Sequence, residues 1–184
     1  ISHNMEDFPD HRVNLFRMLQ ALSDHCFNSF LDYCSNKSDV IEGVMWAIKH
    51  SETNMMMTGL HILDSFVARV GDSEFAEPFF TSYIQSIITD VMSAMLDTMH
   101  QPGFHLHCSI LASIFSVVRD QPEDSPIGSN PGAYMMSENL SGLETLTPTQ
   151  IDTFVADSFN CAHDINAFKT LMADFLIEVQ VWGA

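Results

Sequence analysis

The pattern that most constrains this chain is a series of apolar stripes with helical spacing, which recur along most of its length. The clearest stripe consists of Ile84, Ile87, Ile88, Val91, Met95 and Met99. Steps of three and four residues place all of these side chains on one face of a helix, and almost no segment alternates as a half-buried strand would. A helix with one apolar face must bury it against other helices. The pattern therefore predicts an all-α fold.

Comparable stripes predict further helices over about residues 11–26, 38–49, 54–70, 104–118 and 164–181, the last beginning at Asp164. A weaker pattern predicts a helix over 134–146. Thr147 is followed by Pro148 and, three residues on, by Gln150, which is the signature of a capping box at a helix start. Residues 120–133 are rich in Pro, Gly, Ser and acidic residues and are predicted to form the longest loop.

The predicted helices are arranged as repeated pairs. Those starting near residues 11, 54 and 103 each begin a new pair, at intervals of about 43 to 49 residues, close to the roughly 40–47 of HEAT and armadillo repeats. We therefore expect a HEAT-repeat α-solenoid of about three antiparallel helix pairs. It would form one domain over 1–184, with units of about 8–50, 51–100 and 101–184. Spacing alone leaves an irregular helical bundle open as an alternative.

The charge balance restricts the partners. The chain carries 24 Asp and Glu against 7 Lys and Arg, for a formal net charge of -17. Such a surface repels nucleic acid and anionic lipid, because both are bound through Lys and Arg. We therefore expect no direct binding to nucleic acid or membranes, and expect any charged partner to be basic. The alternative is that the acidic charge only keeps the chain soluble.

Four acidic residues are the candidate partner-binding site. Asp90 and Asp97 share the polar face of the helix predicted around Ile84, together with Ser86 and Ser93, whereas Asp39 and Glu42 lie at the start of the helix predicted over 38–49. The second helix of each HEAT pair lines the concave side. The hypothesis is that Asp39, Glu42, Asp90 and Asp97 face a basic protein partner. The alternative is that they form a solvated polar face.

Histidine and cysteine offer the main opportunities for chemistry. His105 and His107 are two positions apart, so on a helix their side chains project about 200° from each other and cannot hold one ion. His107 falls on the apolar side of that helix and is predicted to be buried, whereas His105 points the opposite way. No H-E-x-x-H or C-x-x-C motif is present. We expect no metal site and no cofactor.

The four cysteines, Cys26, Cys34, Cys108 and Cys161, lie within apolar helical patterns. That placement predicts reduced thiols in the core. Cys26 follows His25 directly, but adjacent residues on a helix do not face each other, so they cannot act as a nucleophile and base. The motifs of serine hydrolases and phosphate-binding loops are absent. We therefore expect no catalytic residues and no enzyme activity.

An ordered series of short matches extends over about residues 8–176. It includes Phe8-Pro9-Asp10-His11-Arg12, Trp46-Ala47, Lys49-His50, Thr58-Gly59-Leu60, Pro102-Gly103-Phe104, Ala167-Phe168-Lys169 and Asp174-Phe175-Leu176. In this order and at this spacing the chain resembles the C-terminal HEAT repeats of the exportin-1 family of nuclear export receptors, which are karyopherins. It departs from the family at Met55-Met56-Met57, and residues 120–147 match poorly.

The resemblance implies a C-terminal scaffold segment of a much larger receptor, which carries cargo with leucine-rich export signals out of the nucleus together with Ran-GTP. The implied partners are Ran-GTP, export cargo, the N-terminal repeats of the same receptor and nucleoporins. The implied location is the nucleus and the cytoplasm, with shuttling through nuclear pores. The family's cargo groove and its reactive cysteine lie outside this chain, so none of the four cysteines here takes that role. The alternative is a stand-alone helical-repeat adaptor.

Overall fold

The computed structural model describes residues 9–34, 37–121, 131–141 and 146–179. These residues form α-helices and one 3-10 helix, with no strand in the part of the chain described. The elements are α1 (Pro9–His25), α2 (Phe27–Tyr33), α3 (Lys37–Ile48), α4 (Thr53–Gly71), α5 (Ala76–Met95), η1 (Thr98–Gly103), α6 (Phe104–Arg119), α7 (Pro131–Leu140), α8 (Pro148–Cys161) and α9 (Ile165–Glu178). The prediction of an all-α helical-repeat fold is confirmed.

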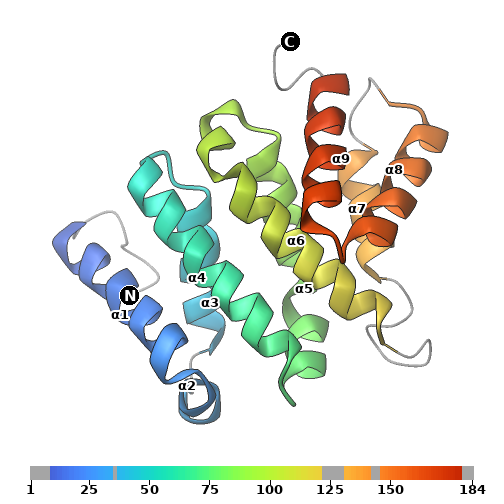
Figure 1. Ribbon diagram of the computed structural model, residues 1–184. Coiled ribbons are helices and arrows are strands. Elements are labelled where there is room, and N and C mark those ends of the chain that lie inside the picture. The colour runs from blue at the N-terminus through green and yellow to red at the C-terminus, as the bar shows by residue number, and fades with distance from the viewer. Residues whose placement is uncertain (1–8, 35–36, 122–130, 142–145, 180–184) are drawn as a thin grey trace.

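The helices are arranged in two layers (Figure 1). The front layer contains α1, α4, α6 and α9, and the back layer contains α3, α5, α7 and α8. Within each layer, every helix contacts the next one in this order. α3 packs on α4, α5 packs on α6, and α8 packs on both α6 and α9. Each helix thus turns its apolar stripe towards the other layer, as a solenoid of paired helices requires.

The α8–α9 hairpin departs from the regular order of the other pairs. α1, α4 and α6 come first in their pairs and lie in the front layer, whereas α9 comes second in its pair and takes the next front position beside α6. Stacked rings hold it there. Phe115 of α6 lies 4.3 Å from Phe159 of α8 between ring centroids, and Phe154 of α8 lies 3.9 Å from Phe175 of α9.

One continuous apolar core runs through both layers. It extends from Phe16 in α1 to Val179 at the end of α9, and its members are less than a tenth exposed. α3 and α4 approach each other closely at Gly59, where an added Cβ would lie 2.8 Å from Ala47 Cβ and 3.0 Å from the backbone nitrogen of Ile48. Glycine is the residue that permits this approach, because any side chain would meet backbone atoms.

Several predicted helix ends agree with the structure. α3 and α4 match the predicted ranges 38–49 and 54–70 within one residue, and α6 matches 104–118 equally well. Thr147 caps α8 in a complete capping box with Gln150, with Pro148 in the first turn. Asp164 caps α9 by accepting hydrogen bonds from two backbone N–H groups. The starts of α8 and α9 were predictable because the cap chemistry is local.

Other features differ from the prediction. The helix predicted over about 11–26 spans Pro9–His25, but Cys26 does not continue its apolar stripe and instead separates it from the short helix α2. α5 begins at Ala76, well before Ile84, and ends at Met95. α7 covers 131–140 in place of 134–146, so residues 131–133 of the predicted loop are helical. Residues 122–130 of that loop and 142–145 of the predicted helix lie outside the described residues.

Candidate protein-interaction surface

Charge is distributed unequally between the two layers. The helices of the front layer carry five basic residues, Arg12, Arg17, Arg69, Arg119 and Lys169, which balance five acidic ones, Asp10, Asp24, Asp64, Asp174 and Glu178. The helices of the back layer carry seven acidic residues, Asp39, Glu42, Glu77, Asp90, Glu138, Asp152 and Asp157, against the single basic residue Lys37. Seven carboxylates and one ammonium leave a net charge of -6 on the back-layer helices. The acidic field of the described helices therefore belongs to one side of the molecule.

Asp39 and Glu42 project from the first half of α3 and are exposed. The hydroxyl group of Ser38 donates a hydrogen bond to Glu42 Oε1 at 3.3 Å. Asp39 lies in the first turn, where a negative charge interacts favourably with the partial positive charge of the helix end. These two carboxylates remain available to a partner from solvent.

Asp90 is half-buried, and its Oδ2 lies 2.9 Å from Lys49 Nζ. The ion pair joins the C-terminal part of α5 to the residue directly after α3, so it ties two neighbouring back-layer helices together. Because Lys49 is about half exposed, water and salt screen the pair, and such pairs contribute roughly 0–1 kcal/mol. The charge of Asp90 is thus already balanced within the chain.

Asp97 is not on the same helix as Asp90, in contrast to the prediction. α5 ends at Met95, and Asp97 caps η1 by accepting a hydrogen bond from the Met99 backbone N–H at 3.0 Å. A carboxylate at this position satisfies an N–H group that the helix start leaves open, which favours ending α5 here. The four candidate carboxylates therefore form no single row, and Asp97 has a structural role.

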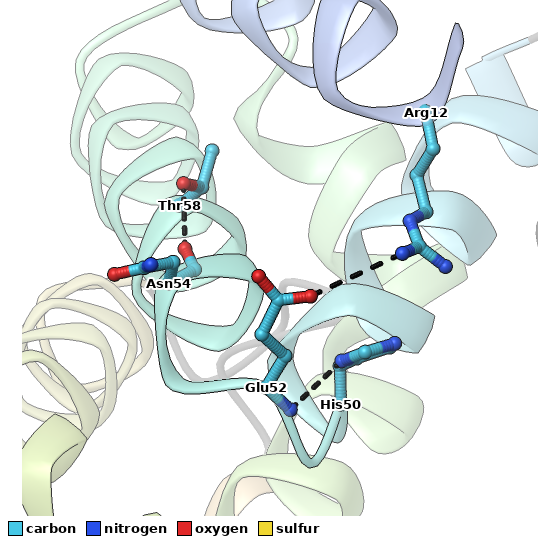
Figure 2. Close-up of polar contacts among 5 residues, drawn as sticks. All are labelled: Arg12, His50, Glu52, Asn54 and Thr58. Carbon is cyan, nitrogen blue, oxygen red and sulfur yellow. Dashed lines mark hydrogen bonds and ion pairs between the residues drawn. The ribbon is translucent and has the colours of Figure 1, made fainter. Parts of the chain in front are cut away.

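A polar cluster between α1 and the α3–α4 turn was not identified from the sequence, although Arg12, Trp46 and His50 fall within the exportin-like matches. Figure 2 shows Arg12 pointing towards Glu52, with Arg12 Nη2 4.0 Å from Glu52 Oε2. His50 Nδ1 accepts a hydrogen bond from the Glu52 backbone N–H at 2.9 Å (Figure 2). The Arg12 guanidinium also lies 5.6 Å from the centroid of the Trp46 ring. The cluster fixes the position of the α3–α4 turn against α1 by stacking and charge.

Two histidines are buried where η1 meets α6. His107 is fully buried, as predicted, and His105 is exposed on the opposite side of α6. Burial, and to a smaller extent the nearby His100, lowers the pKa of His107 to about 4. His100 Nδ1 lies 3.3 Å from Asp97 Oδ2 but lacks the alignment of a hydrogen bond. His107 is therefore a neutral core residue at physiological pH.

The cysteines only partly agree with the prediction of core thiols. Cys108 is buried, and burial raises its pKa to about 12. Cys161 is half-buried, and burial again raises its pKa. Cys26 is exposed at the break between α1 and α2, so its placement in the core was wrong, and Cys34 is half-buried. A buried thiol with a raised pKa is a poor nucleophile, because the thiolate is the reactive form.

No group of three or more His, Cys, Asp or Glu side chains in the described part of the chain is placed to hold a metal ion. None of the helices described there is both long and apolar enough to cross a membrane.

Paired helices stacked in two layers over one core define a helical-repeat protein of the HEAT type. The family model described as "CRM1 C terminal" matches residues 1–184, and the chain belongs to this family, the C-terminal region of exportin-1 proteins. It is 33% identical to Exportin-1 of Dictyostelium discoideum over 99% of its length, 32% identical to Exportin-1 of Drosophila melanogaster over 98%, and 30% identical to Protein EXPORTIN 1B of Arabidopsis thaliana over 100%. The chain spans 18% of each of these relatives.

Proposed function

We propose that this chain is the C-terminal scaffold segment of a nuclear export receptor that carries leucine-rich-signal cargo together with Ran-GTP. The observation that carries the proposal is that the CRM1 C-terminal model matches the whole chain. Relatives named Exportin-1 are more than five times as long, so the cargo groove and most of the GTPase contact would lie in other repeats. The family match favours a receptor segment over a stand-alone adaptor.

In this proposal the chain works by binding, and catalysis plays no part. The solenoid supplies a curved wall, and the receptor shuttles between nucleus and cytoplasm through contacts with nucleoporins. The N-terminal repeats of the same receptor would continue the stack beyond α1. Exposed apolar side chains at that end support this contact, since Val13 and Met18 of α1 are 38% and 52% exposed and Tyr33 of α2 is 86% exposed.

The acidic back layer would face the basic surface of Ran-GTP or cargo. Asp39 and Glu42 are the favoured contacts, because both are exposed and neither is paired with a lysine or arginine in the described chain. Asp90 and Asp97 would add to the negative electrostatic field of the back layer without contacting the partner directly. Asp90 is already paired with Lys49, and Asp97 already caps η1. A field of this kind raises association rates and is screened by salt.

The test is a calorimetric titration of the 184-residue chain with Ran loaded with GTP or with GDP, at low and at moderate salt. We expect tighter binding of the GTP form, and weaker binding as salt rises. The double variant Asp39→Asn/Glu42→Gln should weaken binding about fivefold, since each exposed charge contributes roughly 0–1 kcal/mol. Asp152→Asn/Asp157→Asn on α8 is the matched control, because it removes the same charge from exposed positions of the same layer.

Equal effects of the two double variants would show that the net charge matters and that α3 is no specific contact. Absence of binding to either form of Ran would overturn the GTPase contact of this chain. The scaffold role would then be tested by adding the chain to the remaining repeats of its receptor and measuring whether they associate.

A further inference from the structure

The strongest unexplained feature is an apolar pocket in the back layer, between α2, α3 and the first half of α5. It encloses about 220 Å³. Aromatic side chains form half of its lining, namely Phe30, Phe66, Phe75, Phe79 and Tyr83. Among the described residues that line the pocket, Lys37 is the only charged one. An apolar cavity of about 150 Å³ can hold benzene, so this pocket has room for an aromatic ring with a substituent.

The walls are fixed by contacts within the core. The rings of Phe30 and Phe66 meet edge to face at 5.6 Å, and those of Phe79 and Tyr83 lie 5.2 Å apart. Phe66 and Phe79 are buried, whereas Phe30, Phe75 and Tyr83 are half-exposed, so the inner wall is rigid and the outer rings face the opening. Edge-to-face and offset-stacked contacts between two aromatic rings are favourable beyond the burial of their apolar area.

The position of Lys37 determines the charge of the ligand. It is the only basic residue on the back-layer helices, and its Nζ lies 5.9 Å from the centroid of the Phe75 ring. A carboxylate next to a bound ring would reach this ammonium group. Further negative charges would be repelled, because Asp39 and Glu42 follow on the same helix. The pocket therefore suits an aromatic ring that carries a single carboxylate.

We propose that this pocket binds the C-terminal residue of a partner polypeptide that ends in an aromatic side chain. In such a residue the ring and the α-carboxylate are a few bonds apart, and Lys37 lines the same pocket as the aromatic rings, so one residue can contact both. The rim residues Pro78 and Ser82 are exposed on α5, so the preceding residues of the partner can leave the pocket into solvent. The inference rests on the proposed protein-binding function and names one class of partner.

The probe is the peptide Ser-Gly-Ser-Gly-Ser ending in 4-fluorophenylalanine with a free carboxylate. Its fluorine signal is titrated with the 184-residue chain at low salt. Companion peptides end in the corresponding amide or in alanine. We expect the acid to bind, the amide to bind about fivefold more weakly, and the alanine peptide not to bind, because one charge-assisted contact at a half-exposed site contributes roughly 1 kcal/mol.

Chain variants locate the site. Lys37→Gln should lower the affinity for the acid peptide about fivefold and leave the affinity for the amide peptide unchanged. Ser82→Trp should abolish binding of the acid peptide by filling the opening of the pocket. Lys49→Gln is the matched control, because it removes the other lysine near α3, which pairs with Asp90 and does not line the pocket. Thermal unfolding confirms that each variant is folded before it is used.

Equal binding of acid and amide, or an unchanged affinity for the acid in Lys37→Gln, would overturn the proposal. Tighter binding of free N-acetyl-4-fluorophenylalanine than of the peptide would show that the ligand is a small aromatic acid and would overturn the polypeptide partner. The Ran titration on the same sample separates the two proposals. Ran-GTP binding without peptide binding overturns only the pocket, and peptide binding without Ran binding overturns only the GTPase contact.

Discussion

Stability between pH 4 and 7 should depend on His107. Its ring is fully buried and its pKa is about 4, against an ordinary value of 6.5. Above pH 6.5 the ring is neutral in both states, so its contribution is constant. Below pH 6.5 the unfolded chain takes up a proton that the folded chain does not, and this favours unfolding until the pH reaches about 4. At 1.36 kcal/mol per pKa unit, the loss is about 2 kcal/mol by pH 5 and about 3 kcal/mol by pH 4.

The assay is urea unfolding followed by far-ultraviolet circular dichroism at pH 7 and pH 5, for the wild type and for His107→Gln. The acidic residues titrate in both chains, so the informative quantity is the difference between the two losses in free energy of unfolding. We expect the wild type to lose about 2 kcal/mol more than His107→Gln. His105→Gln measures the effect of removing an exposed imidazole from the same helix. Equal losses in wild type and His107→Gln would refute the reasoning from burial.

Three further predictions concern packing, thiols and capping. Gly59→Ala should lower the free energy of unfolding by about 1–2 kcal/mol in urea unfolding, because overpacking against Ala47 outweighs the gain in helix propensity; a stabilised variant would contradict the close approach. In titration with Ellman's reagent, the exposed Cys26 should react well before Cys108, because Cys108 is buried and should react only when the chain unfolds. Early modification of Cys108 in the folded chain would contradict its burial. Thr147→Ala should lower the free energy of unfolding by about 1 kcal/mol, because it removes the capping box of α8. Thermal unfolding measures this loss, with Thr149→Ala as the control, and equal losses in the two variants would argue against the cap.

The sequence was most informative where structure depends on neighbouring residues. The capping box at Thr147 and the burial of His107 were both predictable, because capping depends on a few adjacent residues and burial on the register of one apolar stripe. The HEAT-type pairing followed from the spacing of such stripes. Family resemblance then supplied what spacing left open, which was the choice between a solenoid and an irregular bundle.

The sequence was least informative where distant residues decide the structure. The break at Cys26 turns α2 so that the Phe27 ring meets Phe66 of α4 edge to face at 5.1 Å, a contact that no local pattern reveals. Asp97 was assigned to α5 because a cap for the following 3-10 helix and a continued polar face look alike in sequence. The aromatic pocket was missed for the same reason, since its walls come from four separate helices and a turn.

The unequal charge of the two layers gives the described helices a permanent electric dipole moment across the thickness of the solenoid. A positively charged body that approaches by diffusion would experience a force that directs it towards the back layer before any side chain touches. At physiological ionic strength this steering reaches only about 8 Å, so it acts during the last stage of an encounter. The chain would thus select the side on which a partner arrives as well as the sign of its charge.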